Sequence, residues 1–411
     1  MNATSDSISE STGALPAGWR CARLGDVCRL LNGDAYKEDD WSPTGLPIVR
    51  IQNLNDRSKP FNCWQGDSSG KVSISTGDLL LAWSGTPGTS FGAHIWDRGP
   101  ALLNQHIFRV DLDRSLLLPG WAVHAINQQL GVLIGRAHGA VGLRHVRRAE
   151  VSDLVVPLPP LPEQSRIAAI LDAQHAAVER AKEAAQAQLD YGSALPAAYL
   201  RGAFPQPNHP LRPGWRWIRL GDVSSLLPSK SIASDGDTRV RAVTTASLTE
   251  TGFSIAGTKP ARMWSADVPA CTLTAGEILI ARSNTPELVG RAALFPGSAA
   301  PVVATDLTIR VRAHEGLLPE YAAGYLSAIY AAGYWRTHAG GASGSMKKIT
   351  RTQVSQLPVP LAPLAEQRQL GAALSGRLSA ALTLRTRLEA QRTEIGALAP
   401  AFLRQAFSGE V

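Results

Sequence analysis

The sequence predicts an α+β fold in two tandem copies. Each copy is a globular part followed by a long α-helix, and the two helices pair as an antiparallel coiled coil. Three observations predict this arrangement. Segments recur at an offset of about two hundred residues, short apolar runs bounded by turn residues fill each globular part, and a proline-rich run then opens a long stretch of helix-forming residues.

Composition restricts the class of protein. The 411 residues exceed one ordinary domain, and the 44% hydrophobic content excludes general disorder. The net charge of +7 on only 18% charged residues favours a local basic surface and a nucleic-acid partner. Residues 1–205 contain 19 basic and 20 acidic residues, and residues 206–411 contain 22 and 14, so the excess lies in the second copy.

Cysteines and apolar runs indicate the compartment. The four cysteines form no CxxC pair and lie at no zinc-binding spacing, so we expect no metal site. The sequence contains no run of about 18 apolar residues, the length that a membrane-spanning helix needs. The Ser/Thr-rich start, residues 1–15, lacks the apolar segment of a signal peptide and is expected to be a flexible tail. We therefore expect a cytoplasmic protein.

The duplication rests on five pairs of segments that keep the same order. The pairs are residues 18–27 with 214–223, 77–82 with 276–281, 117–121 with 317–321, 151–164 with 354–367, and 200–204 with 403–407. Chance does not produce so many matches in one order, so the chain is two copies of one unit.

Within each globular part, strands come before a helix. The runs at 46–51, 78–83 and 106–112 are apolar and bounded by Gly, Pro, Asp or Asn, which is typical of strands. Helical stretches are expected at about 121–136 and 321–337. Strands and helices in one part give the α+β class.

The long helices are expected at about 163–195 and 366–399, ended or kinked by Pro196 and Pro400. Apolar residues alternate at spacings of four and three, which is typical of a coiled-coil seam. The alternative, that each helix packs only on its own globular part, stays open. The residues expected to pair the helices or dock other subunits are Ile167, Leu171, Val178, Leu370, Leu374, Leu384, Leu388 and Ile395.

No motif for catalysis is apparent. The sequence has no GxGxxG or HExxH motif, and no Asn/Asp-Pro-Pro-aromatic tetrad of the kind associated with amino methylation of DNA bases. We expect no catalytic residues, and the duplicated plan predicts two similar binding sites.

Three groups of residues suit DNA. Basic segments precede each proline-rich run, loop tips follow the matching strands 77–82 and 276–281, and polar residues end two early strands. A solvated basic turn or ordinary loop variation remains an alternative explanation. The candidates are Arg144, His145, Arg147, Arg148, Lys347, Lys348 and Arg351 in the basic segments; Trp83, Ser84, Thr86, Arg282, Ser283, Asn284 and Thr285 at the tips; and Arg50, Gln52, Asn53, Arg241 and Thr244 at the strand ends.

Over nearly all of its length, the chain resembles the specificity subunits of type I restriction-modification systems. The resemblance rests on Gly-Trp-x-x-x-x-Leu-Gly-Asp-Val at 18–27 and 214–223, Gly-Asp/Glu-x-Leu-x-Ala at 77–82 and 276–281, and Pro-Leu-x-x-Leu-x-Glu-Gln at 157–164 and 360–367. The last motif is followed by a long helix twice in one chain, which is specific to this family.

The resemblance implies a DNA-binding subunit without catalytic activity. Residues 16–158 and 206–358 would be target-recognition domains, each reading one half of a bipartite, asymmetric site in double-stranded DNA. Residues 159–205 and 359–411 would be spacer helices that dock two methyltransferase subunits, and restriction/translocase subunits would join for cleavage. S-adenosylmethionine, ATP and Mg²⁺ would belong to those partners, so no cofactor is expected here.

Three alternatives stay open. The chain could be an orphan or anti-restriction DNA-binding variant, could itself be a methyltransferase or nuclease, or could be a scaffold between proteins.

Overall fold

The computed structural model describes residues 15–85, 91–136, 144–341 and 346–410. The chain divides into two compact units, which are residues 1–184 with 392–411 (unit 1) and residues 185–391 (unit 2). Unit 1 contains the first globular part, the start of helix α7 (Leu161–Ala203) and the end of helix α12 (Leu364–Ser408). Unit 2 contains the second globular part with the remaining portions of both helices.

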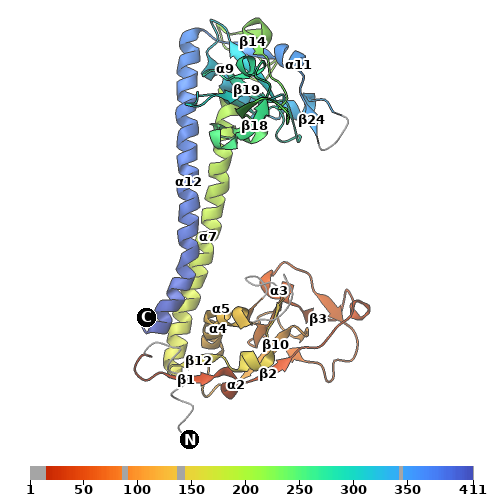
Figure 1. The fold of residues 1–411 in the computed structure, drawn as a ribbon. Helices are drawn as coiled ribbons and strands as arrows, with labels where there is room; N and C mark the ends of the chain where they lie inside the picture. The colour runs from red at the N-terminus through yellow and green to blue at the C-terminus, as the bar shows by residue number, and fades with distance from the viewer. Residues whose placement is uncertain (1–14, 86–90, 137–143, 342–345, 411) are drawn as a thin grey trace. The chain divides into compact units, whose positions relative to one another are not determined.

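The globular part of unit 1 contains two four-stranded sheets and two short strand pairs (Figure 1). One sheet is antiparallel and the other is mixed, because β3 and β9 run parallel. The antiparallel sheet has the strand order β2 (Cys28–Asn32), β10 (Ile107–Leu112), β6 (Leu79–Ala82) and β8 (Gly92–Ile95). The mixed sheet has the order β4 (Asn62–Trp64), β3 (Leu46–Val49), β9 (Ala101–Leu103) and β5 (Ser73–Ile74). The two strand pairs are β1 (Arg20–Arg23) with β12 (Val155–Leu158), and β7 (Ser84–Gly85) with β11 (Arg144–His145). The helices are α2 (Leu24–Val27), η1 (Glu38–Asp40), α3 (Ile51–Asn55), α4 (Pro119–Gln128), α5 (Leu130–Arg136) and α6 (Arg148–Ser152).

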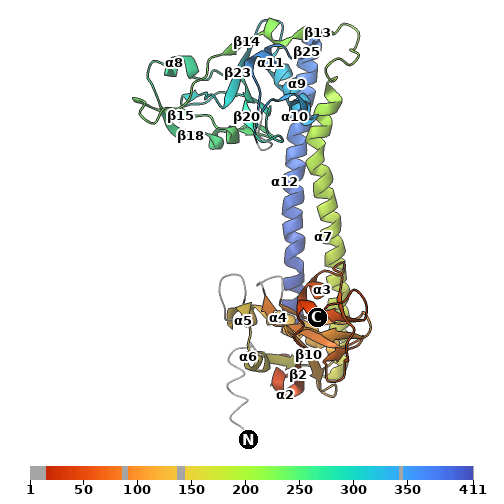
Figure 2. The same ribbon diagram turned by 90° about the vertical axis from the view of Figure 1, so that its right-hand side faces the viewer.

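Unit 2 repeats this plan (Figure 2). Its four-stranded antiparallel sheet has the order β14 (Ser224–Leu227), β23 (Thr308–Ala313), β19 (Ile278–Ala281) and β21 (Ala292–Leu294). Its three-stranded sheet has the order β18 (Lys259–Met263), β15 (Thr238–Ala242) and β22 (Val302–Val303). The strand pairs are β13 (Arg216–Arg219) with β25 (Pro358–Leu361), β16 (Leu248–Thr249) with β17 (Gly252–Phe253), and β20 (Ser283–Asn284) with β24 (Lys347–Lys348). Its helices are η2 (Leu220–Asp222), η3 (Thr245–Ser247), η4 (Ile255–Gly257), α8 (Val268–Cys271), α9 (Pro319–Ala331), α10 (Tyr334–His338) and α11 (Arg351–Ser355). The predicted α+β class is confirmed in both copies.

The recurring Leu-Gly-Asp-Val motif has a steric cause. A Cβ on Gly25 would lie 2.8 Å from the Ser152 side chain, and one on Gly221 would lie 2.1 Å from Ser355 Oγ. Only glycine lets this turn approach α6 in unit 1 and α11 in unit 2 so closely. The motif therefore marks a packing contact that each copy repeats.

Each predicted globular helix is interrupted. The stretch expected at 121–136 is α4 followed by α5, and the stretch expected at 321–337 is α9 followed by α10. In unit 2 the break lies at Gly333, whose φ of +79° ends a helix without strain. The sequence pattern located both helical regions but not their breaks.

The long helices run antiparallel within each unit, as predicted. In unit 2, Gly192 of α7 faces Leu388 of α12, whereas Phe204, just beyond the end of α7, lies beside the earlier residue Leu374. In unit 1, the end of α12 packs on the core that contains the start of α7. Buried positions recur every seven residues at Gln164, Leu171, Val178, Ala185 and Gly192 in α7, and at Gln367, Leu374, Ala381 and Leu388 in α12.

Neither Pro196 nor Pro400 ends its helix. Helix α7 continues to Ala203 and α12 to Ser408. The helix ends expected near these prolines are wrong, because tertiary packing holds the last two turns. Phe204 packs edge-on against Tyr321, with ring centroids 5.3 Å apart, and Phe407 stacks on Trp121 at 4.7 Å. The end of each long helix therefore completes the core of the globular part that belongs to the other copy.

Candidate nucleic-acid interface

Each globular part carries a two-stranded tip in which two of the candidate groups meet. Strand β7 pairs with β11, and β20 pairs with β24, in the same antiparallel register. Ser84 lies opposite His145 in the first, which we call tip 1, and Ser283 lies opposite Lys348 in the second, tip 2. The structure thus brings residues after the matching strands together with the basic segments.

The strand entering each tip is held identically. The Trp83 N–H donates to the carbonyl of His106 at 3.2 Å, and the Arg282 N–H donates to that of Leu307 at 2.8 Å. The carbonyls of Trp83 and Arg282 accept the N–H of the residue after β11 and β24, at 3.0 and 2.8 Å. Trp83 and Arg282 are therefore equivalent positions on one scaffold, as are His106 and Leu307.

Tip 1 is a cluster of aromatic and histidine side chains. The Ser84 hydroxyl lies 2.7 Å from His145 Nδ1 and is buried. The Trp83 ring stacks on Phe108 at 5.5 Å and lies 5.8 Å from the His106 ring and 5.9 Å from the His145 ring. Burial lowers the pKa of His106, which keeps this imidazole neutral at pH 7. Among the described side chains, tip 1 therefore offers aromatic surface and imidazole groups, and Arg144 belongs to the same strand pair.

Tip 2 is basic. Arg282 is exposed, and its side chain makes no hydrogen bond or ion pair with the part of the chain that the structure describes. Lys348 is exposed and Lys347 is half-buried. Asn284 Oδ1 accepts the N–H of Thr285 at 2.9 Å, so its amide nitrogen remains available. An unpaired guanidinium beside two ammonium groups matches a guanine edge flanked by phosphates.

Two basic candidates serve the fold. Arg148 Nη2 donates to the carbonyl of Leu30 at 2.5 Å. The matching Arg351 donates to the carbonyls of Leu226 and Leu227, at 2.6 and 2.8 Å. Both arginines tie a helix start to the first strand of the antiparallel sheet. This shared tie gives their recurrence a structural reason, and because both side chains are exposed, contact with DNA stays a prediction for each.

Two polar candidates are also used internally. Asn53 is fully buried, and its amide donates to the carbonyls of Lys59 and Pro60 at 3.2 and 3.1 Å. Thr244 caps the turn η3, and its hydroxyl donates to the carbonyl of Gly257 at 2.7 Å. Both residues shape loops, and Asn53 cannot reach a base from its buried position. The prediction of a DNA contact is therefore wrong for Asn53, and it stays a prediction for half-buried Thr244.

The remaining candidates keep accessible groups. Gln52 and Arg147 are exposed, and the Arg147 N–H, not its side chain, caps α6. Half-buried Arg50 lies 5.0 Å above the Trp41 ring. Arg241 is exposed, with Nε donating to a threonine hydroxyl at 2.5 Å. The side chain of Arg144 and the whole of Thr86 lie outside the described residues.

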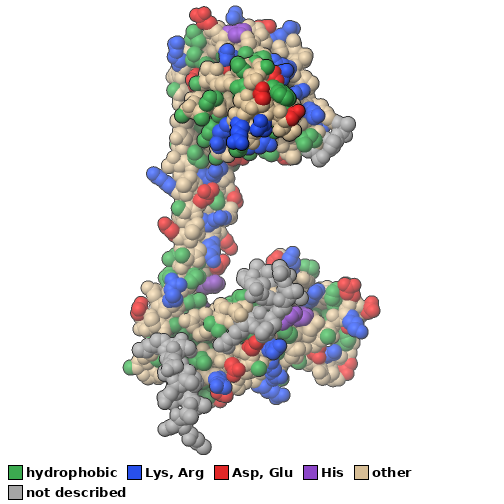
Figure 3. All heavy atoms as spheres, viewed as in Figure 1, with side chains coloured by type: hydrophobic (Ala, Val, Ile, Leu, Met, Phe, Trp, Pro, Cys, Tyr) green, Lys and Arg blue, Asp and Glu red, His purple; other side chains and the backbone are tan. Residues whose placement is uncertain are grey.

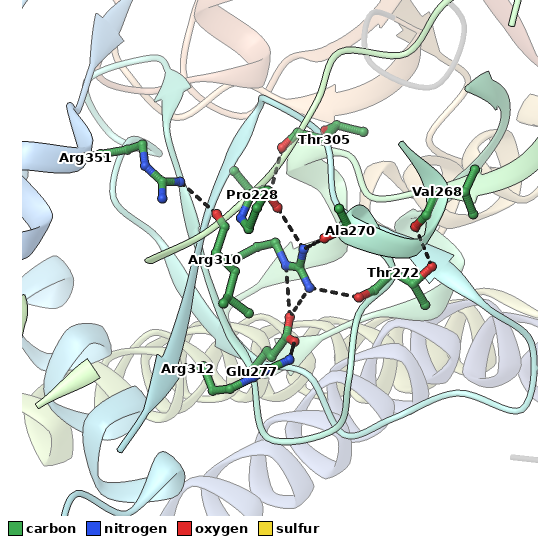
Figure 4. A network of polar contacts seen from close by, with 11 residues as sticks. Pro228, Val268, Ala270, Thr272, Glu277, Thr305, Arg310, Arg312 and Arg351 are labelled. Atoms are coloured by element: carbon green, nitrogen blue, oxygen red, sulfur yellow. Dashed lines mark hydrogen bonds and ion pairs between the residues drawn. The ribbon is translucent and has the colours of Figure 1, made fainter. Parts of the chain in front are cut away.

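A buried ion pair underlies tip 2 (Figure 4). Glu277, at the turn before β19, and Arg310, on β23, are 1% and 2% exposed, and their charged groups lie 2.8 Å apart. Arg312 reaches the same carboxylate at 2.6 Å from the surface. The Arg310 guanidinium also donates to the carbonyls of Pro228, Ala270 and Thr272 at 2.6 to 2.8 Å. A fully satisfied pair of this kind fixes the strand that leads into Arg282.

The matching positions in unit 1 are arranged differently. Arg109 occupies the place of Arg310, but it pairs with Asp111 at 2.8 Å and its side chain is 26% exposed. Asp78, in the place of Glu277, accepts the N–H of Ser75 at 2.7 Å. The strand leading into tip 1 thus rests on a more exposed, simpler ion pair.

The glutamine of each Pro-Leu-x-x-Leu-x-Glu-Gln motif joins a long helix to its globular part. Gln164 and Gln367 are buried, and each side chain makes three hydrogen bonds of 2.8 to 2.9 Å. Gln164 accepts from Leu118 and donates to Leu116 and Pro159; Gln367 accepts from Leu318 and donates to Gly316 and Ala362. Sequence reasoning missed this role, although the repeated glutamine was the signal for it.

The proposed helix-pairing residues differ in burial. Ile167, Leu171, Val178, Leu374 and Leu388 are buried, and Leu370 and Ile395 are half-buried. Leu384 is 40% exposed, which contradicts its placement in the seam and leaves it a candidate for subunit docking only. In the seam of α12, the half-buried residue after Ala381 is Arg385, four residues later, and not Leu384, three residues later. The Arg385 guanidinium lies 3.6 Å from the Glu250 carboxylate.

The described residues contain neither a membrane-spanning helix nor a metal-binding cluster. No helix there is both long enough and apolar enough to cross a membrane. No group of three or more His, Cys, Asp or Glu residues in those ranges could hold a metal ion.

Known proteins share this organisation. A family model described as the type I restriction modification DNA specificity domain matches residues 16–188. The EcoBI specificity subunit of Escherichia coli is 27% identical over 166 residues, which cover 40% of this chain and 34% of that protein. The StySPI specificity subunit of Salmonella potsdam is 22% identical over 97% of this chain and 90% of that protein.

Solved structures share the fold over the whole chain. A structure described as the basis of complex assembly and conformational transition of the type I R-M system is 22% identical, with a TM-score of 0.73 over 97% of this chain and all of that one. The HsdS subunit from Thermoanaerobacter tengcongensis is 21% identical, with a TM-score of 0.64 over 98% of this chain and all of that one. The family model identifies residues 16–188 as similar to a type I restriction modification DNA specificity domain, and the chain as a whole is similar in sequence and fold to specificity subunits of type I restriction-modification systems.

Proposed function

We propose that the chain is the non-catalytic specificity subunit of a type I restriction-modification complex and reads a bipartite, asymmetric site in double-stranded DNA. The observation that carries the proposal is the pair of tips. Their backbones have the same register, but Trp83 and His145 stand in one where Arg282 and Lys348 stand in the other. One scaffold with two different chemical ends suits two half-sites of different sequence.

The long helices would set the gap between the half-sites. Binding of one tip makes binding of the second intramolecular, so two weak contacts become one strong contact at a fixed spacing. The buried glutamines Gln164 and Gln367 support this role, because they fix each helix start on its recognition domain. Spacer length would then follow from helix length.

We propose domain boundaries and partners accordingly. Residues 16–158 and 206–358 would be the recognition domains, and 159–205 and 359–411 the spacer helices. Two methyltransferase subunits would dock on the helices, where Leu384 offers an exposed apolar group, and restriction/translocase subunits would join them. S-adenosylmethionine, ATP and Mg²⁺ would be bound by these partners, and the DNA would be met in the cytoplasm.

The spacer proposal is tested by removing one heptad from each long helix. Seven residues shorten a helix by about 10 Å, which is close to three base-pair steps of about 3.4 Å. Duplexes selected from a random library by the shortened chain should keep both half-sites and lose about three base pairs of spacer. Two unchanged half-sites at an unchanged spacing, or an altered half-site, would contradict the proposed division of work.

A further inference from the structure

One face of sheet β18–β15–β22 in unit 2 exposes three arginines. Side chains alternate across a strand, so Arg239 and Arg241 of β15 share one face with Pro260 and Arg262 of β18. All four residues are exposed. The opposite face contains Ala242 and Met263, which are buried in a small apolar core. We call Arg239, Arg241 and Arg262 the arginine face.

The three positive charges are close together and lack carboxylate partners. Arg239 lies directly opposite Arg262 in the antiparallel register, where like charges repel. Across the described residues, none of the three forms an ion pair. Arg241 and Arg262 each donate through Nε to a neutral oxygen, at 2.5 and 2.6 Å, and their terminal nitrogens make no hydrogen bond with the described residues. Folding alone gives no reason to place these charges side by side.

Two further features suit a nucleic-acid backbone. Arg239 and Arg241 are two residues apart on a strand, a separation of about 6.6 Å, which is close to two axial steps of about 3.4 Å between phosphates on one DNA strand. Directly after β18, Trp264 is 46% exposed. An exposed indole beside arginines is typical of surfaces that pack against sugars or bases. Figure 3 shows Lys and Arg side chains gathered in a patch on the second globular part.

Unit 1 lacks a counterpart. In unit 1, β3 runs parallel to β9 and antiparallel to β4, as β15 in unit 2 runs parallel to β22 and antiparallel to β18. Ile48 of β3 lies opposite Leu102, and Ala242 of β15 lies opposite Val303, so Ile48 and Ala242 are equivalent positions. In this register Gly45, Pro47 and Gln65 take the places of Arg239, Arg241 and Arg262. The sheet that carries three positive charges in unit 2 carries none in unit 1.

We infer that the arginine face binds the phosphate backbone of duplex DNA irrespective of sequence, so the second recognition domain has an anchor for the DNA backbone that the matching sheet of the first domain lacks. The inference rests on the proposed function, because it assigns a second, non-reading contact to the same DNA partner. An arginine face recognises phosphates by bidentate, charge-assisted hydrogen bonds that carry no information about the base.

The test compares three full-length variants on a random-sequence duplex, measured by fluorescence anisotropy between 50 and 300 mM salt. Arg239→Gln/Arg241→Gln/Arg262→Gln should weaken binding and flatten the slope of log K against log salt by about 2 to 3, since each lost phosphate contact removes about 0.9. Arg239→Lys/Arg241→Lys/Arg262→Lys keeps the charges and should keep most of the slope. The charge-matched control Arg216→Gln/Arg219→Gln/Arg368→Gln removes three exposed arginines elsewhere in unit 2 and should leave the slope unchanged.

Two outcomes would overturn the inference. One is a glutamine variant with the same slope as the charge-matched control. The other is unchanged DNA binding with weakened association of partner subunits, which would assign the face to an acidic protein surface. The proposed function fails separately, if the unaltered chain prefers no duplex sequence over random DNA. In that event a flattened slope in the glutamine variant would still support the arginine face.

Discussion

The two recognition domains share a scaffold and differ at its ends. Tip 1 presents the rings of Trp83, His106 and His145, whereas the equivalent positions of tip 2 include Arg282 and Lys348. The backbone hydrogen bonds that hold the strands of the two tips match position by position. The two copies therefore share the backbone hydrogen bonds that place the tips and differ in the side chains that the tips expose.

The same contrast runs below the surface. Tip 2 rests on a buried ion pair, Glu277 with Arg310, whereas tip 1 rests on the more exposed pair of Arg109 with Asp111. The basic excess of the second copy is partly accounted for by the arginine face. The difference teaches that two copies of one fold can keep the same backbone and still differ in how their charged side chains are paired and exposed.

The largest expected effect sharpens the contrast between the ion pairs. Arg310→Ala leaves the Glu277 carboxylate buried with only Arg312 near it and should destabilise unit 2 by about 3 to 5 kcal/mol. Arg109→Ala, its counterpart, should cost about 1 kcal/mol or less, because that pair is partly exposed. Urea denaturation of the full chain measures both, and equal losses would refute the distinction.

The next effect concerns the helix ends. Phe204→Ala removes a buried ring from between Tyr321 and Tyr325 and should cost about 3 kcal/mol. Phe407→Ala should cost less, because Phe407 is only half-buried against Trp121. Each loss should appear in the unit that contains the contact, as measured by hydrogen exchange. If Phe204→Ala reduced protection in the first recognition domain, or Phe407→Ala in the second, the end of each helix would not pack on the domain of the other copy.

A smaller effect separates structural arginines from DNA contacts. Arg351→Ala removes two charge-assisted hydrogen bonds to carbonyls and should lower stability by about 1 to 2 kcal/mol without flattening the salt dependence of DNA binding. Lys347→Ala should do the reverse, with unchanged stability and a salt slope reduced by about 1. If both variants changed only DNA binding, Arg351 would be a DNA contact.

The smallest effect distinguishes the units by pH. Burial lowers the pKa of His94, His106 and His124 in unit 1. As the pH falls, these histidines therefore become protonated in the unfolded chain before they do so in the folded chain. The three neutral imidazoles lower the free energy of the folded state fully above pH about 6.5, and this contribution to stability is lost as the pH falls below it. The melting temperature of unit 1 should fall between pH 7.5 and 5.5, and His106→Asn should reduce that fall. A melting temperature that rises on acidification would contradict the sign.

Sequence alone predicted the parts that repeat. The duplicated motifs, the β6 and β19 strands and the long helices follow from periodicity and composition, which tertiary packing reinforces. It misplaced Leu384, because alternating four- and three-residue spacings do not reveal which side of α12 faces α7. It did not reveal that Arg148 and Arg351 bind main-chain carbonyls, because a repeated basic residue looks the same whether it binds a phosphate or a carbonyl.

Other site residues had no local signal. Asn53 is buried by contacts with its own loop, and nothing in the neighbouring sequence indicates that its amide is already engaged. His106 joins tip 1 only through the pairing of distant strands. The arginine face requires the register of β15 with β18, which places Arg262 opposite Arg239.

The central claim, that the two tips read two separate half-sites, is tested most directly by selecting duplexes from a random library with the full chain and with Arg282→Ala. The account predicts two specified blocks at a fixed spacing for the unaltered chain. It predicts that Arg282→Ala relaxes one position, a guanine, in one block only, at a cost of about 1 to 3 kcal/mol. A single contiguous motif, or a variant that relaxes both blocks equally, would contradict it.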